Sequence, residues 1–216
     1  MSEYLHYLIK SSNVVFWDFD GVIKDSVRVK SIAFEKLFSI YGPKISKKVR
    51  VHHEKNPGLS RFNKIPLYMS WSNELVTNKN VQEFCKNFSL MVKKSVIDSP
   101  WVPGFLEVIE SNHNKQKHIL MTSTPQDEIE DILEILDIRH FFYKIYGAPI
   151  LKNEVISIEL NNLAFKPAQA ILIGDSDSDY EAAIDNGIFF FLRRTDFNKD
   201  LQKICKDNTF EDFINE

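Results

Sequence analysis

The stretch Val14-Val15-Phe16-Trp17-Asp18-Phe19-Asp20-Gly21 decides the fold of this sequence. Its four apolar residues predict a buried strand, and Asp18 and Asp20 follow directly at the end of that strand. Two neighbouring carboxylates in apolar surroundings repel each other and lose hydration. Such a pair is kept most easily if a cation binds between the carboxylates or if one of them is a nucleophile. The alternative is an Asp-x-Asp-Gly turn that closes a hairpin, where Gly21 lets the backbone turn sharply.

A second acidic segment, Gly174-Asp175-Ser176-Asp177-Ser178-Asp179, follows another apolar run at 170–173. Two strands that each end in carboxylates, near opposite ends of the sequence, favour a single metal site over an isolated hairpin turn. The chain would then assemble this site from both of its ends. We interpret Asp177, the additional acid in this segment, as a solvent-facing or helix-capping residue.

The composition is that of an ordinary globular protein, with 216 residues of which 44% are hydrophobic and 26% charged. The 27 Lys and Arg against 30 Asp and Glu give a net charge of -3, which provides no basic footprint for nucleic acid. No apolar run approaches the roughly 20 residues of a membrane helix, and the N-terminus lacks the pattern of a secretory leader. We therefore expect a cytoplasmic protein, a monomer or weak homodimer, that binds neither nucleic acid nor membrane.

Five short runs rich in β-branched or aromatic residues and bounded by turn residues predict strands. They span 14–17, 118–121, 143–146, 170–173 and 188–192. Helical patterns at 127–136, 154–163 and 179–186 separate the last four of these strands. Apolar strands that alternate with helices predict an α/β fold with a parallel sheet covered by helices on both faces. Ligands bind at the carboxyl ends of such strands, which is where both acidic segments fall.

The long segment between the first two predicted strands has helical periodicity and lacks strand signals. Apolar residues share one helix face at 29–41 and another at 80–96, and nearby aromatic residues are numerous enough for a small second core. We predict a helical cap domain at 26–98, inserted into a core domain made of 1–25 and 99–216. A hinged cap would control water at the site. A fixed helical subdomain is the alternative.

Four segments, in this order, resemble the motifs of the haloacid dehalogenase-like (HAD) hydrolase superfamily. They are Asp18-x-Asp20-Gly21-Val22, Thr122 at a strand end, Lys152, and Gly174-Asp175-Ser176-x-x-Asp179. The helical insertion is similar to the C1-type cap of that superfamily. The resemblance implies a Rossmann-like core, and it points to the group that includes C1-cap phosphatases, phosphoglycolate phosphatases and β-phosphoglucomutases.

The resemblance assigns a role to each acidic residue. Asp18 would attack phosphorus and become an aspartyl phosphate, and Asp20 would act as the general acid and base. Because a free aspartic acid has a pKa of about 3.9, we expect the surroundings of Asp20 to shift its pKa, helped by desolvation when the cap closes. Mg²⁺ is the implied cofactor. The resemblance gives it the side chains of Asp18 and Asp175 and the backbone carbonyl of Asp20, with Asp179 acting through water or from behind these ligands.

Thr122 and Ser123 end a predicted strand just before a predicted helix, so a hydroxyl and backbone N–H groups there are expected to cradle phosphate. The alternative, a plain helix cap, does not explain the strand-end position of Thr122. Lys152 is expected to place its charge near the phosphoryl oxygens. Its rivals are Lys144, within a strand pattern, and Lys166, ahead of a strand, and both positions are typical of structural or exposed lysines.

Residues 52–61 are polar, and we interpret them as a loop of the cap that carries two candidate specificity residues, His53 and Arg61. The planar fork of Arg61 is suited to a substrate carboxylate or to hydroxyls. The adjacent His52 and His53 lack the further ligands that a zinc site needs. The alternative is a solvated loop without a role in binding.

The predicted function is Mg²⁺-dependent hydrolysis of a small phosphorylated metabolite, such as a sugar phosphate or phosphoglycolate. By the same resemblance, dehalogenases and phosphonoacetaldehyde hydrolases lack the second aspartate that is present here as Asp20. A phosphomutase of the β-phosphoglucomutase type keeps both aspartates and is the main alternative. A non-catalytic, metabolite-binding module would be expected to have lost a motif carboxylate, and all are present.

Overall fold

The parallel sheet is formed, with one strand more than the sequence predicts. The computed structural model of the protein describes residues 2–112 and 114–214. These residues form a six-stranded sheet in the order β3-β2-β1-β4-β5-β6, and each neighbouring pair is parallel. The strands are β1 (Val14–Trp17), β2 (Lys117–Pro125), β3 (Lys144–Ala148), β4 (Ala170–Gly174), β5 (Phe189–Arg193) and β6 (Thr209–Phe210). Strand β6 has only two residues, too few for a detectable hydrophobic pattern.

Strand β1 lies inside the sheet, between β2 and β4. Val14 is in register with Lys117 of β2 and with Ala170 of β4. Because neither neighbour is antiparallel to β1, the turn after this strand does not close a hairpin, and that alternative is excluded. The carboxyl ends of β1 and β4 are adjacent, so they bring Asp18 and Asp175 together although the two residues are far apart in the sequence.

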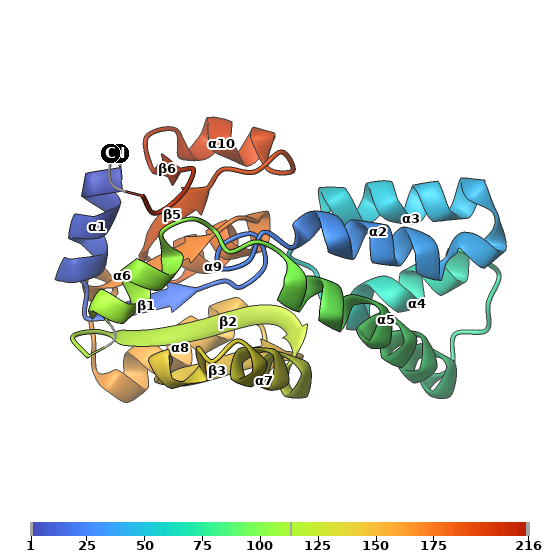
Figure 1. Ribbon diagram of the computed structural model, residues 1–216, viewed down its shortest axis with the longest axis horizontal. Helices are drawn as coiled ribbons and strands as arrows, with labels where there is room; N and C mark the ends of the chain where they lie inside the picture. The colour runs from blue at the N-terminus through green and yellow to red at the C-terminus, as the bar shows by residue number, and fades with distance from the viewer. Residues whose placement is uncertain (1, 113, 215–216) are drawn as a thin grey trace.

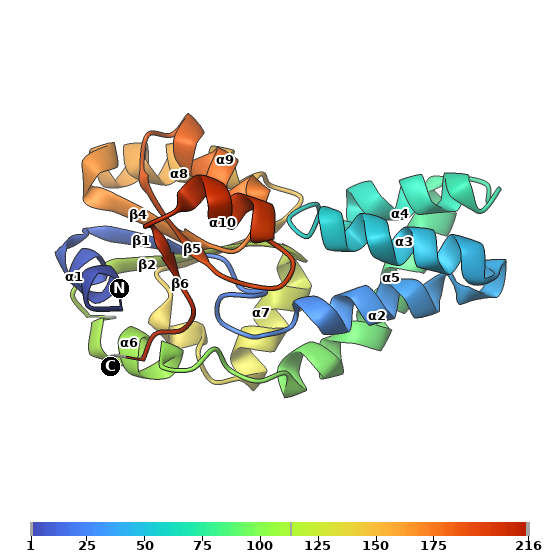
Figure 2. The same ribbon diagram turned by 90° about the horizontal axis from the view of Figure 1, so that it is seen from above.

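Helices cover the two faces of the sheet (Figure 2). One layer contains α1 (Ser2–Ser11), α6 (Phe105–Asn112) and α7 (Gln126–Ile135), and the other contains α8 (Lys152–Leu163), α9 (Asp177–Asp185) and α10 (Lys199–Cys205). Alternate residues of β1 serve the two layers, because successive side chains of a strand point to opposite faces. Val15 and Trp17 are buried in one hydrophobic core, and Val14 and Phe16 are buried in the other.

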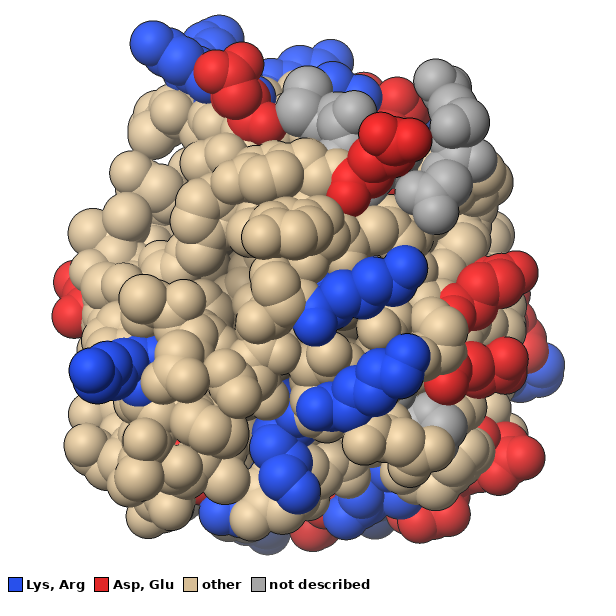
Figure 3. All heavy atoms as spheres, turned by 90° about the vertical axis from the view of Figure 1, so that its left-hand side faces the viewer, with Lys and Arg blue, Asp and Glu red and all other residues tan. Residues whose placement is uncertain are grey.

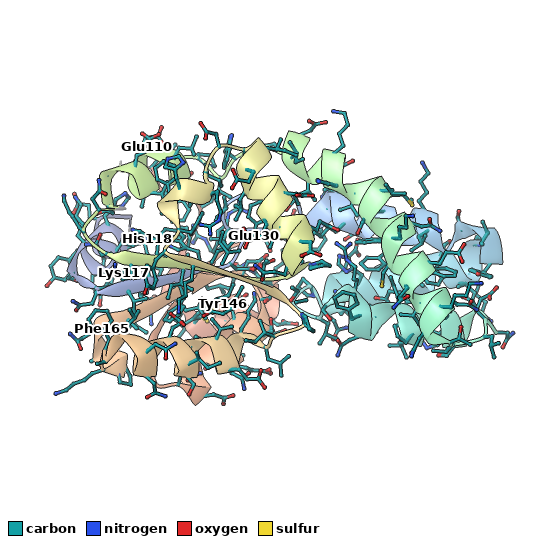
Figure 4. All side chains as sticks on the ribbon, turned by 90° about the horizontal axis from the view of Figure 1, so that it is seen from below. Glu110, Lys117, His118, Glu130, Tyr146 and Phe165 are labelled. Atoms are coloured by element: carbon teal, nitrogen blue, oxygen red, sulfur yellow. The ribbon has the colours of Figure 1, made fainter. Side chains whose placement is uncertain are left out.

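Polar side chains within these layers bond across neighbouring elements. Trp17 Nε1 donates a hydrogen bond of 2.9 Å to Nδ1 of His118 in β2. The Tyr146 hydroxyl of β3 donates to Glu159 of α8 at 2.6 Å, and Lys144 forms an ion pair with the same carboxylate at 2.8 Å. Figure 4 labels His118 and Tyr146 on the sheet. Lys144 is therefore a structural residue rather than a rival of Lys152.

The segment between β1 and β2 forms a separate helical lobe beside the carboxyl ends of the strands (Figure 1). It consists of α2 (Val27–Leu37), α3 (Pro43–Lys55), α4 (Arg61–Trp71) and α5 (Asn78–Asp98). Short 3-10 turns lie at Ser39–Tyr41, Arg139–Phe141 and Pro167–Gln169. Aromatic rings fill the centre of the lobe, where Phe34 stacks on Phe88 with 3.9 Å between ring centroids and Phe38 meets Tyr68 edge-on at 5.5 Å.

The polar loop expected at 52–61 is shorter than predicted. His53 lies in the last turn of α3, and Arg61 is the first residue of α4, so that only 56–60 connect the two helices. The turn chemistry of Asn56-Pro57-Gly58 falls within this short connection, which explains where the helix breaks.

The end of the sheet that faces away from the lobe has no concentration of charged side chains among the described residues in the view of Figure 3. In Figure 3, lysines and acids on that end are scattered among uncharged residues. The concentration of titratable groups described below lies at the opposite, carboxyl end. Within residues 2–112 and 114–214, every helix is too short or too polar to cross a bilayer.

Candidate active site

Three carboxylates meet at the carboxyl ends of β1 and β4. Asp18, Asp175 and Asp179 each contribute an oxygen, and these oxygens all lie within 4.8 Å of one another. All three side chains are buried. Asp175 Oδ2 is a buried oxygen for which the described residues provide no hydrogen-bond donor. A buried carboxylate without compensation is strongly unfavourable, so the donor set fits a bound cation.

Gly21 makes room for the Asp175 carboxylate. Its φ is +83°, and a Cβ at this position would lie 2.1 Å from Asp175 Oδ2. The Gly21 carbonyl accepts a hydrogen bond from Arg193 Nη1 at 3.0 Å, and Asn198 Nδ2 donates to the Asp175 carbonyl at 2.7 Å. Glycine is therefore needed here both for its backbone conformation and for the space it leaves.

Lys152, the first residue of α8, bridges two of the carboxylates. Its Nζ lies 2.9 Å from Asp18 Oδ1 and 2.5 Å from Asp179 Oδ1. Asp179 Oδ2 accepts hydrogen bonds from the Ser176 hydroxyl at 2.5 Å and from the Ser176 backbone N–H at 3.2 Å. Because protein donors occupy both of its oxygens, Asp179 is better suited to orient Lys152 than to bind a metal directly.

Burial dominates the electrostatics of Asp18 and Asp175. It raises the pKa of Asp18 to about 7, with Lys152 opposing the increase and Asp179 and Asp20 adding to it. The pKa of Asp175 is raised well above its usual range by burial and then by Asp18 and Asp179. The protein alone therefore favours the protonated forms of Asp18 and Asp175, and a divalent cation would favour their charged forms.

Asp20 is in a different situation, because partners from the helical lobe hold it as a carboxylate. Ser26 Oγ donates to Asp20 Oδ1 at 2.6 Å, and Lys30 Nζ donates to Asp20 Oδ2. Burial raises the pKa of Asp20, but the charge and hydrogen bond of Lys30 and the bond from Ser26 outweigh burial, and the pKa lies below its usual value. The sequence analysis expected desolvation to help make Asp20 an acid at neutral pH, but in this arrangement its polar partners outweigh desolvation. Nothing in the sequence marked Lys30, a lysine of α2, as the partner of Asp20.

A cavity of about 40 Å³ between the sheet and the lobe collects nearly all the predicted site residues. Only Asp179 is missing from its lining, and it lies behind Lys152. The predicted residues in the lining are Asp18, Asp20, His53, Arg61, Thr122, Ser123, Lys152 and Asp175.

The loop at 56–60 lies directly on the ends of the strands. The Ser123 hydroxyl donates to the carbonyl of Gly58. A Cβ at Gly58 would lie 2.0 Å from Ser178 Oγ, so only glycine allows this close approach. The lobe therefore engages Ser123, whereas the Thr122 hydroxyl accepts a hydrogen bond from the backbone N–H of Thr124 at 3.2 Å.

Arg61 lines the cavity, but a carboxylate of the sheet domain holds its guanidinium group. Its Nη1 and Nη2 donate to the two carboxylate oxygens of Glu128 in α7 at 2.7 and 2.6 Å, and Nη1 also donates to Ser89 of α5. Burial raises the pKa of Glu128, but Arg61 outweighs burial and the pKa is lowered. Arg61 thus fastens the lobe to the sheet domain, and Glu128 is a residue that the sequence analysis missed.

His53, the second candidate for substrate contact, is buried in the cavity wall with 3% of its surface exposed. Its Nδ1 lies 3.0 Å from Nζ of Lys64 in α4. Lys64 lines the same cavity, and the sequence analysis did not single it out. Neither residue is in a solvated loop.

The family of the protein follows from its sequence. Residues 15–192 match the haloacid dehalogenase-like hydrolase family, a range that includes both acidic segments and the inserted helices. The chain therefore belongs to the haloacid dehalogenase-like hydrolases, and the predictions of this family and of a hydrolase are confirmed. No curated protein was matched with this sequence.

Several solved structures are similar to the fold. A predicted phosphoglycolate phosphatase from Haemophilus somnus has a TM-score of 0.74 at 17% identity, covering 94% of this chain and 95% of that protein. CbbY from Rhodobacter sphaeroides, in complex with xylulose-(1,5)bisphosphate, has a TM-score of 0.73 at 13% identity, covering 94% and 95%. A haloacid dehalogenase-like hydrolase from Streptococcus pneumoniae has a TM-score of 0.67 at 23% identity, covering 92% and 93%. At these identities the similarity confirms the fold.

Proposed function

We propose that this protein is a Mg²⁺-dependent phosphatase that hydrolyses a small phosphorylated metabolite through an aspartyl-phosphate intermediate. The proposal is carried by the buried carboxylates of Asp18, Asp175 and Asp179, together with an Asp175 oxygen that has no partner among the described residues. A site that needs a divalent cation and holds a lysine beside its nucleophile is suited to an anionic substrate. Membership of a hydrolase family supports the same reaction class.

The side chains of Asp18 and Asp175 and the backbone carbonyl of Asp20 would hold the metal. Mg²⁺ prefers oxygen donors and commonly binds through one or two carboxylates and a substrate phosphate. When bound, the ion would neutralise charge on the carboxylates and on the phosphoryl group, so that one anion can approach another. The raised pKa values of Asp18 and Asp175 in the metal-free protein support this need for positive charge.

Asp18 would attack phosphorus with one carboxylate oxygen while the bond between phosphorus and the leaving oxygen breaks. Lys152, 2.9 Å from Asp18 Oδ1, orients this carboxylate and adds positive charge beside the phosphoryl oxygens. Thr122, buried in the cavity wall three residues before the end of β2, would offer its hydroxyl to the same oxygens. Water would then attack the aspartyl phosphate and release inorganic phosphate.

Asp20 would give a proton to the leaving oxygen and later remove one from the attacking water. With Lys30 and Ser26 as partners it is charged, which is the form that accepts a proton from water. An anionic phosphoryl group close to Lys30 and Asp20 would compete for the lysine and raise the pKa of Asp20. Substrate binding would thus favour the acid form of Asp20 for the first step.

The helical lobe at 26–98 would act as a hinged cap. Its two connections to the sheet domain run side by side, since the Asp25 N–H donates to the Pro100 carbonyl at 2.9 Å and the Val102 N–H donates to the Ile23 carbonyl at 3.0 Å. The cavity is small and lies under loop 56–60, so a substrate would enter when the lobe moves away. The structures similar to this fold also support a small phosphorylated substrate, because one is a predicted phosphoglycolate phosphatase and another holds a bisphosphate.

Phosphate release from a panel of phosphorylated metabolites tests the proposal. With Mg²⁺, at least one small phosphomonoester should be hydrolysed; a chelator should stop the reaction, and added Mg²⁺ should restore it. The Asp18→Asn variant should keep the circular dichroism of the wild type and lose at least about 10⁴-fold in turnover. Normal turnover by this variant would eliminate the covalent mechanism.

A phosphomutase of the β-phosphoglucomutase type is the second candidate. It is favoured by the buried Arg61–Glu128 pair, which helps to exclude water from the site when the lobe is in contact with the sheet domain. Both candidates use Asp18 and Asp20, and their products separate them. A phosphatase releases inorganic phosphate, whereas a mutase yields an isomer of its phosphorylated substrate.

A further inference from the structure

Four cationic side chains line the cavity between the sheet and the lobe, and three of them have a carboxylate partner. The three pairs are Lys152 with Asp18, Lys30 with Asp20, and Arg61 with Glu128. The fourth cation is Lys64 of α4. Its Nζ has as neighbours His53 Nδ1 at 3.0 Å and the Pro57 carbonyl at 3.2 Å, and no carboxylate of the described residues forms an ion pair with it.

Lys64 is costly in this position. Only 2% of its surface is exposed. Burial lowers its pKa well below the usual range, and the nearby charge of Lys30 lowers it further. An apolar side chain of similar length would fill the same space without this desolvation, so packing alone does not explain a lysine here.

His53 adds a buried ring nitrogen without a hydrogen-bond partner among the described residues to the same cavity wall. In its charged form Lys64 can only donate, so His53 Nδ1 then accepts from it and the proton of the neutral ring is on Nε2. Burial, and then the charge of Lys64, keep the pKa of His53 well below its usual value, so the ring is neutral. His53 Nε2 is buried, and no residue within the described ranges accepts its hydrogen bond. A buried N–H without an acceptor is unfavourable unless a ligand provides one.

We propose that Lys64 and His53 form a second anion-binding subsite, and that the substrate carries a carboxylate or a second phosphate besides the phosphoryl group that is cleaved. This inference rests on the proposed phosphatase function. Asp18, Lys152 and Thr122 are on the sheet side of the cavity, whereas Lys64 and His53 are on the lobe side. The substrate would therefore extend from the sheet domain to the lobe, with one anionic group at each end.

The subsite differs from the one that the sequence alone favoured. Arg61 is three residues before Lys64 on the same helix, but Glu128 already neutralises its guanidinium group. An incoming anion would have to compete with this buried carboxylate for Arg61. At Lys64 it would meet no such competitor, and it would favour the charged form of the amine.

Steady-state kinetics on matched substrate pairs test the subsite. 3-Phosphoglycerate against glycerol 3-phosphate isolates the effect of a carboxylate, and fructose 1,6-bisphosphate against fructose 6-phosphate isolates that of a second phosphate. The wild type should prefer the more highly charged member of at least one pair by tenfold or more in kcat/KM. In Lys64→Met this preference should fall to near unity through a rise in KM. Lys47→Met, an exposed lysine of α3, is the matched control and should keep the preference.

Calorimetry on Asp18→Asn separates this inference from the proposed function, because it measures binding without turnover. Tighter binding of the charged member, lost in Asp18→Asn/Lys64→Met, supports the subsite even if the wild type hydrolyses no phosphomonoester; the phosphatase proposal alone would then fail. Equal affinity for both members of each pair, or no detectable binding, overturns the subsite. Lys64→Met should also melt at or above the wild-type temperature. A lower melting temperature combined with an unchanged substrate preference would mean that Lys64 is structural, and would equally overturn the inference.

Discussion

The sheet side and the lobe side of the cavity carry opposite charge imbalances. On the sheet side, the carboxylates of Asp18, Asp175 and Asp179 lie close together, and Lys152 is the lysine that bridges two of them. On the lobe side, Lys64 is buried without an acidic partner. The sheet side needs a cation and the lobe side needs an anion. A metal ion and a substrate with two anionic groups would supply both.

The comparison also shows where the fold accepts unfavourable burial. Elsewhere in the sheet domain some buried polar groups have partners, as Lys144 and Tyr146 do in Glu159 Oε1. Others among the described residues, such as Glu159 Oε2 and Gln116 Oε1, lack a hydrogen bond. Unsatisfied polar atoms in the cavity wall, Asp175 Oδ2 and His53 Nε2, come one from each side. Active sites commonly keep such destabilising features because function requires them. Each side can therefore be tested by changes in stability as well as in activity.

Removing the Asp175 carboxylate should disrupt the sheet side most strongly. We expect Asp175→Asn to lose at least about 10²-fold in activity, since a metal contributes several kcal/mol of charge stabilisation. Its metal-free form should be more stable than the wild type, because one buried like charge is gone. Folding raises the pKa of Asp175. The Asp175 carboxyl group therefore lowers the stability of the folded protein increasingly as the pH rises above the unfolded pKa of about 3.9. The gain in melting temperature should thus be larger at pH 8 than at pH 5.

Thermal denaturation with and without Mg²⁺ checks this prediction. The ion should raise the melting temperature of the wild type and of Asp177→Asn, whose exposed carboxylate makes it the matched control. It should not raise that of Asp175→Asn. An equal response to Mg²⁺ in all three proteins would remove Asp175 from the metal site.

Breaking the ion pair between the two sides should cost stability. Glu128→Gln leaves Arg61 buried without a carboxylate and should destabilise the protein by about 3 kcal/mol. Asp131→Asn is the control, because it breaks an exposed pair that also joins α7 to the lobe, with Lys93 of α5, and it should change stability by less than about 1 kcal/mol. Folding lowers the pKa of Glu128, so its contribution is present above the unfolded value of about 4.3 and is lost as pH falls through the folded pKa. Denaturant unfolding of both variants at pH 7 measures this difference in the free energy of unfolding. Equal losses of stability in the two variants would refute the prediction.

A smaller effect is expected where the lobe contacts Asp20, the proposed general acid. Lys30→Met removes the charge that outweighs burial at Asp20, so the pKa of Asp20 should rise. The limb of the pH–rate profile that reports Asp20 should then move to higher pH. Lys36→Met, at the exposed end of α2, should leave the profile in place. An unmoved limb in Lys30→Met would mean that this lysine does not set the protonation of Asp20.

The sheet side was predictable because strands fix where their ends lie. An apolar run followed by Asp18 and another followed by Asp175 place both residues at one edge once the strands are parallel neighbours. Lys152 could be chosen over Lys144 and Lys166 from its position next to the following predicted helix. Here the backbone pattern determines the site, and a sequence displays that pattern directly.

The lobe side could not be predicted in this way. Periodicity shows which face of a helix is buried, but not how the helix is rotated against another domain, and the contacts of Lys30, Lys64 and Glu128 depend on that docking. The sequence analysis expected Arg61 to be available to a ligand. Its partner Glu128 lies in α7, far along the chain, so the sequence gives no sign that the two residues meet. The polar residues at 52–61 were interpreted as a loop, although the residues typical of turns are confined to 56–60.

The most direct test of the account is to identify the phosphorylated residue. A single turnover on the best substrate is stopped with acid, and the peptide that contains Asp18 is weighed by mass spectrometry. We predict that this peptide gains the mass of one phosphoryl group in the presence of Mg²⁺, and that the gain is absent with a chelator and in Asp18→Asn. Phosphate release at the normal rate with the peptide unmodified at every quench time, or with the phosphoryl group on another residue, would contradict the account.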